Sequence, residues 1–399
     1  MLSKSILGKI ILALVIFLII ILPFNKVGAT SVSPTSLSAS LRPGESDSPQ
    51  PINTNVTASS VPLDVLFILD LSSSLIQELD ECKSEATNMM NQISSSYADS
   101  KFGVASFMDY PGTFTYPGYS EEYGDAGDGD YAWNLDQDLT TNTGVVATTI
   151  NNLVMGFGGD VPQDYSRVLY ESQFVGWRAN AIKVVVLMGD APTHDEDFYA
   201  PFTFGGDPGR DAIAQTADDL DFQTIVGELA SADIHIVTIN SYTGAPDPFA
   251  TFSFTYMAEQ TGGLYRELGD VSDIPETIVN AVKSTAKFTS ITLRAATGYE
   301  DWMSFSPSSY SDVGDGETKT FQITLNAPAG TNPGTYQFDI FVIGTGSGET
   351  TIGTIPATIN VSTMLPAAGA NSNRHILILG MLALFSAMIY RLQKGKFSL

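Results

Sequence analysis

Two aspartates in this sequence each follow a run of apolar residues. Asp70 ends the stretch "VLFILD", Asp190 ends "KVVVLMGD", and two hydroxyl residues, Ser72 and Ser74, come just after the first aspartate. If both runs are parallel strands, both carboxylates lie at the carboxyl edge of one sheet, which is where such sheets bind ligands. The sequence therefore predicts a cluster of oxygen atoms at that edge.

The predicted cluster has unbalanced charge. Two carboxylates held close together repel by about a few kcal/mol at an effective dielectric constant near 20. No Lys or Arg lies within four residues of Asp70, and Ser72 and Ser74 add neutral oxygens rather than further charge. Few carboxylates combined with neutral oxygen donors suit a hard, partly hydrated dication. We therefore expect Mg²⁺, with Ca²⁺ or Mn²⁺ as alternatives.

The wider pattern predicts an α/β domain over residues 62–286. Apolar runs typical of strands alternate with amphipathic segments of helical length, which indicates a doubly wound, mostly parallel sheet. Runs such as "KVVVLMGD" suit strands that helices cover on both faces. The expected strands are Val65–Leu69, Phe102–Phe107, Val184–Met188, Ile234–Ile239 and Leu264–Leu268, and the expected helices cover about 75–96, 144–155, 165–176, 211–231 and 274–286.

Residues 287–362 follow a different pattern, in which apolar and polar residues alternate. The stretches "TKTFQITL" and "TYQFDIFVI" each place every second side chain on one apolar face, and a Pro-Gly turn separates them. This pattern is typical of a small antiparallel, immunoglobulin-like β-sandwich. Residues 31–60 contain two similar alternating stretches, and two strands alone are marginal in water. We therefore expect them to complete the sandwich, which would make the α/β domain an insertion.

Both ends of the chain carry apolar segments beside basic residues. Residues 1–29 have a basic opening with Lys4 and Lys9, an apolar run and a small-residue exit, which is the layout of a secretory signal peptide, with an uncleaved anchor as the alternative. Residues 376–390 form an apolar segment that is short for a membrane span, and the basic tail 391–399 would stay in the cytoplasm. The body of the protein is therefore expected outside the cell, attached to the membrane or the cell wall.

The composition is strongly acidic, because 44 Asp and Glu residues stand against 19 Lys and Arg residues and give a formal net charge of −25. A surface of this kind repels nucleic acid and anionic lipid headgroups and favours cations. The single cysteine, Cys82, cannot form an internal disulfide, and it lies on the apolar face of the helix expected over 75–96. We expect no nucleic-acid partner and a buried thiol.

The stretch "DLSSS" matches the Asp-x-Ser-x-Ser metal-ion-dependent adhesion site (MIDAS) of von Willebrand factor type A domains. With "FGVASFMDYP", "GGDVPQDY" and "GWRANAIKVVVLMGDAPTH" in order, the chain resembles the integrin β-subunit I-like domain over about residues 62–286. The resemblance implies a Rossmann-like type A fold with one metal. It implies that the metal ligands are Asp70, Ser72, Ser74 and Asp190.

The resemblance leaves the remaining ligands open. The integrin-like pattern has a glutamate after the proline of the middle loop, where this sequence has Gln163 followed by Asp164, and of these two we favour Asp164. Of the family's flanking metal sites, Asp160 matches one ligand of the first, and Glu78 stands at the acidic pair of the second. Only one metal is expected.

A separate acidic stretch, "YGDAGDGDYAW", places three aspartates among glycines. Oxygen ligands at short spacing on a flexible loop are what Ca²⁺ accepts, although the stretch lacks the remaining positions of an EF-hand. A solvated loop is the alternative. The three aspartates are Asp125, Asp128 and Asp130.

The resemblance also implies a function. In the family, a partner's Asp or Glu carboxylate displaces water from the metal, so this chain is expected to be a cell-surface adhesion protein that binds a protein partner in this way. The linker 363–375 contains "LPAAG", which resembles a sortase sorting signal except that Ala368 replaces the usual threonine; a plain single-span anchor is the alternative.

Two other classes of function stay open. In a structural surface-layer or pilus component, the metal would only stabilise the fold. A metal-dependent hydrolase would need a base near the serines, and His194 is the one histidine placed just after a predicted ligand. No Gly-x-Ser-x-Gly elbow is present, so we expect no enzymatic activity.

Overall fold

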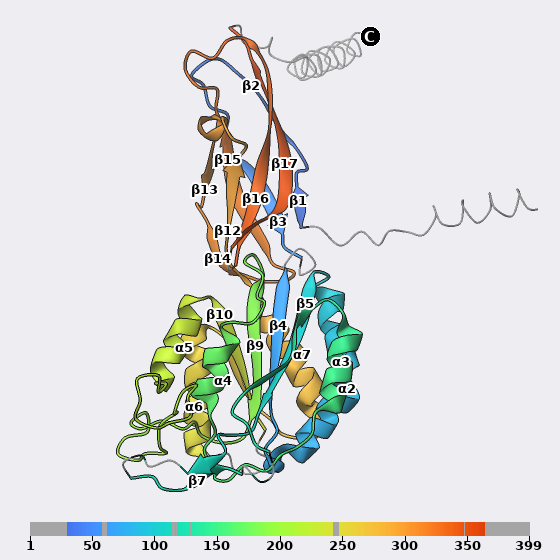
Figure 1. Cartoon of the computed structure of the whole chain (residues 1–399). Helices are drawn as coiled ribbons and strands as arrows, with labels where there is room; N and C mark the ends of the chain where they lie inside the picture. The colour runs from blue at the N-terminus through green and yellow to red at the C-terminus, as the bar shows by residue number, and fades with distance from the viewer. Residues whose placement is uncertain are drawn as a thin grey trace, which may run out of the picture.

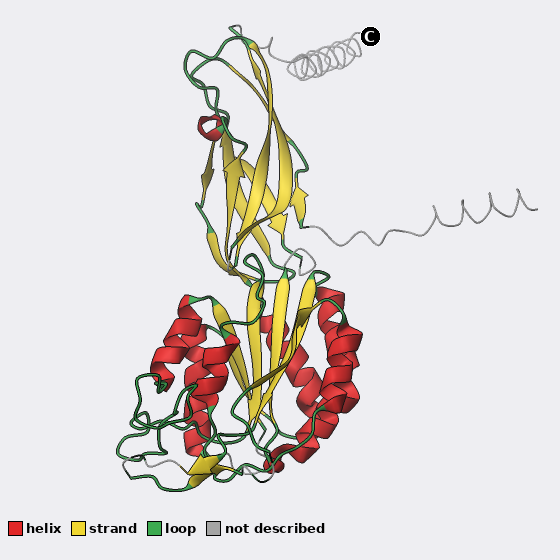
Figure 2. Ribbon diagram, viewed as in Figure 1, coloured by secondary structure: helices red, strands yellow, loops and turns green. Residues whose placement is uncertain are grey.

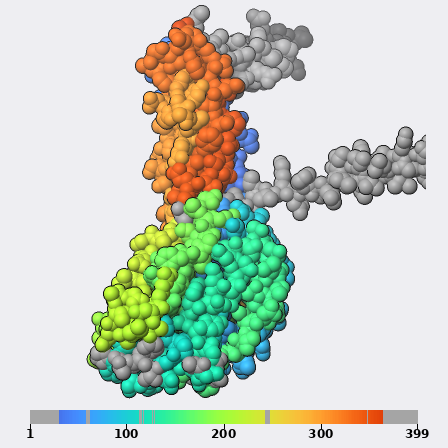
Figure 3. Space-filling model, viewed as in Figure 1, coloured from blue at the N-terminus to red at the C-terminus, as the bar shows by residue number. Residues whose placement is uncertain are grey.

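The computed structural model describes residues 30–363 apart from 58–61, 114–115, 117, 126, 128, 242–246 and 347. An α/β part and a two-sheet part are stacked end to end (Figures 1 and 3). Within this described range, no helix is long and apolar enough to cross a membrane. The predicted signal peptide, sorting signal and cytoplasmic tail lie outside the described residues, as does Asp128.

A six-stranded sheet forms the centre of the α/β part, in the order β11-β10-β9-β4-β5-β8. Its neighbouring strands are parallel except that β8 runs antiparallel to β5. All eight residues of β4 are buried, as expected for a strand covered on both faces. The mixed α/β fold is thus confirmed. The strands are β4 Leu63–Asp70, β5 Ser100–Phe107, β8 Asn134–Thr140, β9 Ile182–Gly189, β10 Ile234–Asn240 and β11 Leu264–Glu267.

Helices cover both faces of this sheet (Figure 2). Because side chains alternate along a strand, Val65 and Phe67 of β4 join the core that contains α2, α3 and α7. Leu66 and Ile68 join the core with α4, α5 and α6 on the other face. The helices are α2 Ile76–Ser96, α3 Thr143–Asn152, α4 Tyr165–Ser172, α5 Phe222–Ser231, α6 Pro248–Thr261 and α7 Ile274–Thr285.

The helix expected over 211–231 is shorter than predicted, because α5 begins only at Phe222. In the preceding segment, the backbone N–H of Arg210 donates to Asp218 and that of Gln215 donates to Asp219. Short acidic side chains that accept backbone N–H groups compete with helix formation. Helix α6 and strand β8 were not expected, because α6 is rich in aromatic and β-branched residues and β8 is acidic.

The second part consists of two sheets, in the orders β1-β3-β15-β13 and β14-β12-β16-β17-β2. Strand β3 pairs with β15 and β2 pairs with β17, so strands from both sides of the α/β part lie in the same sheets. Phe321, Ile323 and Leu325 of β15 and Ile340 and Val342 of β16 are fully buried, which confirms the predicted alternation. The strands are β1 Ser31–Ser33, β2 Leu37–Leu41, β3 Gln50–Asn55, β12 Phe288–Ala295, β13 Met303–Ser306, β14 Tyr310–Val313, β15 Thr318–Leu325, β16 Gly334–Thr345 and β17 Glu349–Val361.

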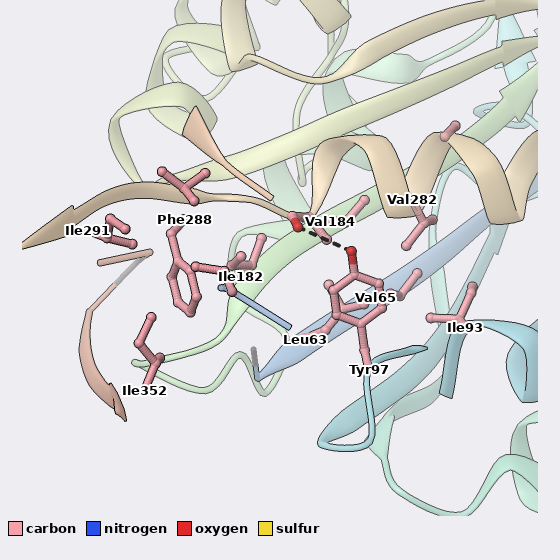
Figure 4. Packing of buried hydrophobic residues seen from close by; sticks show 14 of the residues in the cluster. Leu63, Val65, Ile93, Tyr97, Ile182, Val184, Val282, Phe288, Ile291 and Ile352 are labelled. Carbon is pink, nitrogen blue, oxygen red and sulfur yellow. Dashed lines mark hydrogen bonds between the residues drawn. The ribbon is translucent and has the colours of Figure 1, made fainter. Parts of the chain in front are cut away.

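The two parts share a continuous apolar core at their junction. Phe288 of β12 packs among residues of the α/β part, and the hydroxyl of Tyr97 donates to the carbonyl of Ala286 at 3.3 Å (Figure 4). The β16–β17 hairpin also reaches the α/β part, because a Cβ on Gly348 would lie only 2.7 Å from the carbonyl oxygen of Ala179. The junction is therefore a packed contact as well as a covalent connection.

Near this junction, Arg178 forms ion pairs with Asp64 of β4 and with Asp99, the residue before β5. Its Nε donates to Asp64 Oδ1 and its backbone N–H donates to Asp64 Oδ2, both at 2.8 Å. Its guanidinium also donates to the carboxylate of Asp99. The Asp64 side chain is fully buried, so Arg178 neutralises a charge that water cannot reach.

We expect Arg178→Ala to lower the free energy of unfolding by about 3 kcal/mol, because it leaves the Asp64 carboxylate buried without its cation. Urea denaturation measures this loss. The control is Arg294→Ala, which removes the exposed ion pair with Glu349 and should leave stability nearly unchanged. Equal losses in the two variants would contradict the importance of Asp64 burial.

Candidate metal centre

Asp70 and Asp190 lie at the ends of neighbouring strands. Strands β4 and β9 pair in parallel up to Leu69 and Met188, so the residues that follow emerge together at the carboxyl edge of the sheet. Asp70 is only 1% exposed, whereas Asp190 is partly exposed. One edge of the sheet therefore carries two carboxylates, one of them buried.

The two serines extend this pair into a chain of oxygens. Ser72 N–H donates to Asp70 Oδ1 at 2.8 Å, which turns the backbone after β4. Ser72 Oγ lies 3.2 Å from Ser74 Oγ, and Ser74 Oγ donates to Asp190 Oδ1 at 3.3 Å. Adjacent ligands of an octahedral ion lie about 3.0 Å apart for Mg²⁺ and about 3.4 Å apart for Ca²⁺. The observed oxygen spacings fit ligands of such an ion.

The electrostatics of the pair also call for a cation. Asp70 Oδ2 is buried and has no hydrogen-bond partner among the described residues. Burial, and secondarily the charge of Asp190, raise the pKa of Asp70 to about 8. Burial also raises the pKa of Asp190, against the hydrogen bond from Ser74. A dication would relieve both effects, because it supplies the missing partner and the missing charge.

The middle loop brings Gln163, rather than Asp164, to this site. Gln163 lines the same cavity as Ser72 and Asp190, and its Oε1 is buried without a partner among the described residues. Asp164 does not line that cavity. Its Oδ2 accepts from Tyr110 N–H at 3.1 Å, and burial together with the neighbouring Asp109 raises its pKa well above the ordinary value. The position of Asp164 therefore does not support the prediction that Asp164, rather than Gln163, is the metal ligand from the middle loop.

A cavity of about 670 Å³ opens above these oxygens. Its walls come from the loop after α3, the loop after β9 and the start of α6. None of the described residues that line it is Lys or Arg, so the described wall of the cavity supplies no cation to balance the carboxylates. The lining residues are Ser72, Ser73, Ser74, Phe157, Gly158, Asp160, Val161, Gln163, Asp190, Ala191, Asp247 and Pro248.

A second group that could hold a metal lies beside the first. One ligand atom each of Asp109, Asp160 and His194 lies within 4.8 Å of the other two. His194 Nε2 is 3.4 Å from Asp109 Oδ2 and 3.6 Å from Asp160 Oδ1, and none of these three buried atoms has a hydrogen bond among the described residues. Asp109 follows β5 as Asp70 ends β4, so the same strand-end reasoning would have found it.

A proton on His194 is the other way to balance this second group. The imidazole stacks on Tyr123 with the ring centroids 3.7 Å apart, and Nδ1 lies 2.5 Å from the carbonyl oxygen of Phe204. Burial alone lowers the pKa of His194, but Asp160 and Asp164 outweigh it and raise this pKa above its ordinary value. A protonated imidazole between two carboxylates therefore needs no metal.

The other secondary ligands predicted from the sequence have different surroundings. Glu78 is buried in the first turn of α2, where burial raises its pKa, and it does not line the cavity. Asp130 braces a loop, because its carboxylate accepts from the backbone N–H groups of Phe157 at 3.1 Å, Gly158 at 2.9 Å and Asp125 at 2.8 Å. These bonds use both oxygens, so the calcium interpretation is not supported for Asp130.

Comparison with known proteins identifies a family likeness in part of the chain. Residues 58–197, about a third of the sequence, match the family model of the integrin beta chain VWA domain. This range contains the Asp-x-Ser-x-Ser stretch and the loop of Gln163 but ends shortly after Asp190. No curated protein matches the sequence.

Several solved structures are similar in fold at low sequence identity. A von Willebrand factor type A protein from Catenulispora acidiphila aligns over 85% of this chain and 75% of its own, with 12% identity and a TM-score of 0.39. The pilus adhesin SpaC from Lactobacillus rhamnosus GG aligns over 79% of this chain and 46% of its own, with 10% identity and a TM-score of 0.41. The ArnB paralog VWA2 from Sulfolobus acidocaldarius aligns over 84% of this chain and 76% of its own, with 14% identity and a TM-score of 0.32.

The raised pKa of Asp70 predicts how stability varies with pH in EDTA. The folded chain keeps the Asp70 proton up to pH of about 8, whereas an unfolded aspartate loses it near pH 4. Stability is therefore expected to fall as pH rises between these values, by up to roughly 1.4 kcal/mol per pH unit from this group. Urea denaturation at several pH values checks this. Asp70→Asn should reduce the slope, and an unchanged slope would contradict the assignment.

Proposed function

We propose that Asp70, Ser72, Ser74 and Asp190 hold one divalent cation, with Gln163 as a further oxygen donor, and that a protein partner binds this ion through an Asp or Glu carboxylate. The observation that carries the proposal is the Asp70 oxygen, buried without a partner among the described residues, beside Asp190, which lines an open cavity without a described Lys or Arg in its wall. The ion would supply a Lewis acid that accepts an oxygen ligand from outside the chain.

The neutral donors determine how strongly such an ion attracts an external acid. Two carboxylates cancel the charge of a dication, and Ser72, Ser74 and Gln163 add oxygen without adding charge. A glutamate in place of Gln163 would make the occupied site net negative and would weaken its attraction for another carboxylate. The glutamine therefore supports the binding of an acidic ligand, with Mg²⁺ proposed and Ca²⁺ or Mn²⁺ also compatible with all-oxygen ligands.

The position of the cavity supports a role in surface binding. Strands β4 and β9 begin at the junction with the two-sheet part and end at the cavity, while β17 ends at Val361 at the opposite extremity of the molecule (Figure 1). If the segment after residue 363 attaches the chain to a membrane or cell wall, the cavity points away from that surface. We therefore propose an extracellular, anchored adhesion protein.

The surroundings of the serines favour binding over hydrolysis. His194, the one histidine near the site, directs its ring nitrogens at Phe204, Asp109 and Asp160. Ser74 shares its hydroxyl with Ser72 and a carboxylate rather than with a base. Because Ser74 is exposed in an open cavity, a ligand can approach the ion, which favours adhesion over a purely structural metal.

We expect Asp70→Ala to weaken Mg²⁺ binding by more than about 100-fold, because loss of a partner outside the metal shell already costs up to that factor. Titration calorimetry at millimolar Mg²⁺ measures this, since sites of this kind bind weakly. The control, Asp301→Ala, makes the same charge change at an exposed residue of the two-sheet part and should bind normally. Mg²⁺ binding that survives in Asp70→Ala would end the proposal.

A second pair of variants separates the two residues of the middle loop. Gln163→Ala should weaken Mg²⁺ binding by about tenfold, because it removes an oxygen that lines the cavity. Asp164→Asn should leave it nearly unchanged, because this side chain accepts from Tyr110 N–H instead. The same titration measures both variants, and the reverse order of affinities would reinstate Asp164 as the ligand.

A further inference from the structure

Two large apolar side chains stand beside the proposed metal position without being buried. Phe157 is 52% exposed and Val161 is 64% exposed, and both line the cavity that contains Ser72, Ser74 and Asp190. Single exposed apolar residues are common on proteins, but two that share one cavity with a binding site offer a contact surface. Together they form an apolar rim, a name used below for Phe157 and Val161.

The backbone holds Phe157 firmly in this exposed position. Its N–H donates to Asp130 Oδ1 at 3.1 Å, and its carbonyl oxygen accepts from Ser73 N–H at 3.1 Å. Gly158 follows with a φ of +77°, a left-handed turn that also brings the loop against Ser72. The acidic loop thus has a function: Asp130 fixes the backbone at Phe157 beside the serines, so the loop itself loses little freedom when a ligand packs there.

The charges of the cavity limit which residues a ligand can carry next to the carboxylate that binds the ion. Asp160 and Asp247 line the walls, so a second acid on the ligand would meet carboxylates rather than the ion. A basic neighbour gains little, because the Asp160 side chain is only 1% exposed and Asp247 already caps the start of α6. Asp247 accepts from two N–H groups at the start of α6, and Asp160 accepts from the hydroxyl of Tyr119. The apolar rim is an exposed part of the wall that carries no charge, so it can take an apolar neighbour of the acid.

We propose that the partner presents its Asp or Glu next to a bulky apolar side chain, which packs on Phe157 and Val161 while the carboxylate reaches the ion. This specificity rests on the proposed metal-dependent function. The cavity of about 670 Å³ has room for both side chains, since ligand cavities commonly span about 300–1,000 Å³. Burial of one large apolar side chain should strengthen binding by roughly tenfold or more.

The experiment selects peptides from a phage library with a fixed central aspartate and random neighbours. The full chain is immobilised in millimolar Mg²⁺, and bound phage are eluted with EDTA. We expect bulky apolar residues beside the aspartate to be enriched roughly tenfold over serine, lysine and glutamate. Phe157→Ser and, independently, Val161→Ser should reduce this enrichment while EDTA still elutes phage. Phe174→Ser alters a ring that is 62% exposed outside the cavity and should change nothing.

The possible results separate this inference from the function on which it rests. Phage that elute with EDTA but show no apolar preference, or one unaffected by both Phe157→Ser and Val161→Ser, would overturn the apolar rim and leave metal-dependent binding intact. Enrichment of lysine or glutamate beside the aspartate would do the same. If EDTA elutes no more phage than buffer, the proposed metal-dependent function fails, and the inference fails with it.

Discussion

The arrangement of this site depends on the cost of placing two carboxylates at the ends of adjacent parallel strands. Asp70 is 1% exposed, its second oxygen has no partner among the described residues, and Asp190 stands beside it. The sheet cannot separate them, because the pairing of β4 with β9 fixes both strand ends. Without a protein cation in the cavity wall, either a proton or a dication must balance the charge. The serines and Gln163 are suited to the second solution, because they add oxygen ligands without adding charge.

The neighbouring acidic residues show how the same chain balances charge by other means. Asp109 and Asp160 flank His194, and Asp160 and Asp164 raise its pKa against burial, so a protonated imidazole can balance the charge of the two flanking carboxylates. Burial and the neighbouring Asp109 raise the pKa of Asp164, against the hydrogen bond from the backbone N–H of Tyr110, so Asp164 favours its protonated form. Asp109 and Asp160 thus have an imidazole within reach, whereas Asp70 accepts from the N–H of Ser72 and has a second oxygen without a partner among the described residues. The contrast explains why the proposed ion is assigned to Asp70 rather than to the most acidic part of the loops.

Two strands of the central sheet run from the junction with the two-sheet part to the edge that carries Asp70 and Asp190. Strands β4 and β9 each start in the packed junction around Phe288 and end at the cavity, about 23 Å away at about 3.3 Å per residue. Strands from before and after the α/β part lie in the same two sheets, so two chain connections and the β16–β17 hairpin join the parts. The cavity therefore lies at the end of the α/β part that is opposite the two-sheet part.

Local sequence determined the central parallel strands and the oxygens that follow them, because a buried strand has a continuous apolar run and the residue after it must emerge at the sheet edge, whereas it did not reveal α6 or β8. Asp70, Ser72, Ser74 and Asp190 could be chosen on that basis, as could the alternating faces of β15 and β16. Tertiary structure decided what spacing cannot encode. The middle loop places Gln163 in the cavity wall and Asp164 against the backbone N–H of Tyr110, and folding brings Asp109, Asp160 and His194 together from three loops. It also exposes Phe157 beside the serines, because Asp130 holds that loop through backbone hydrogen bonds that no local pattern reveals.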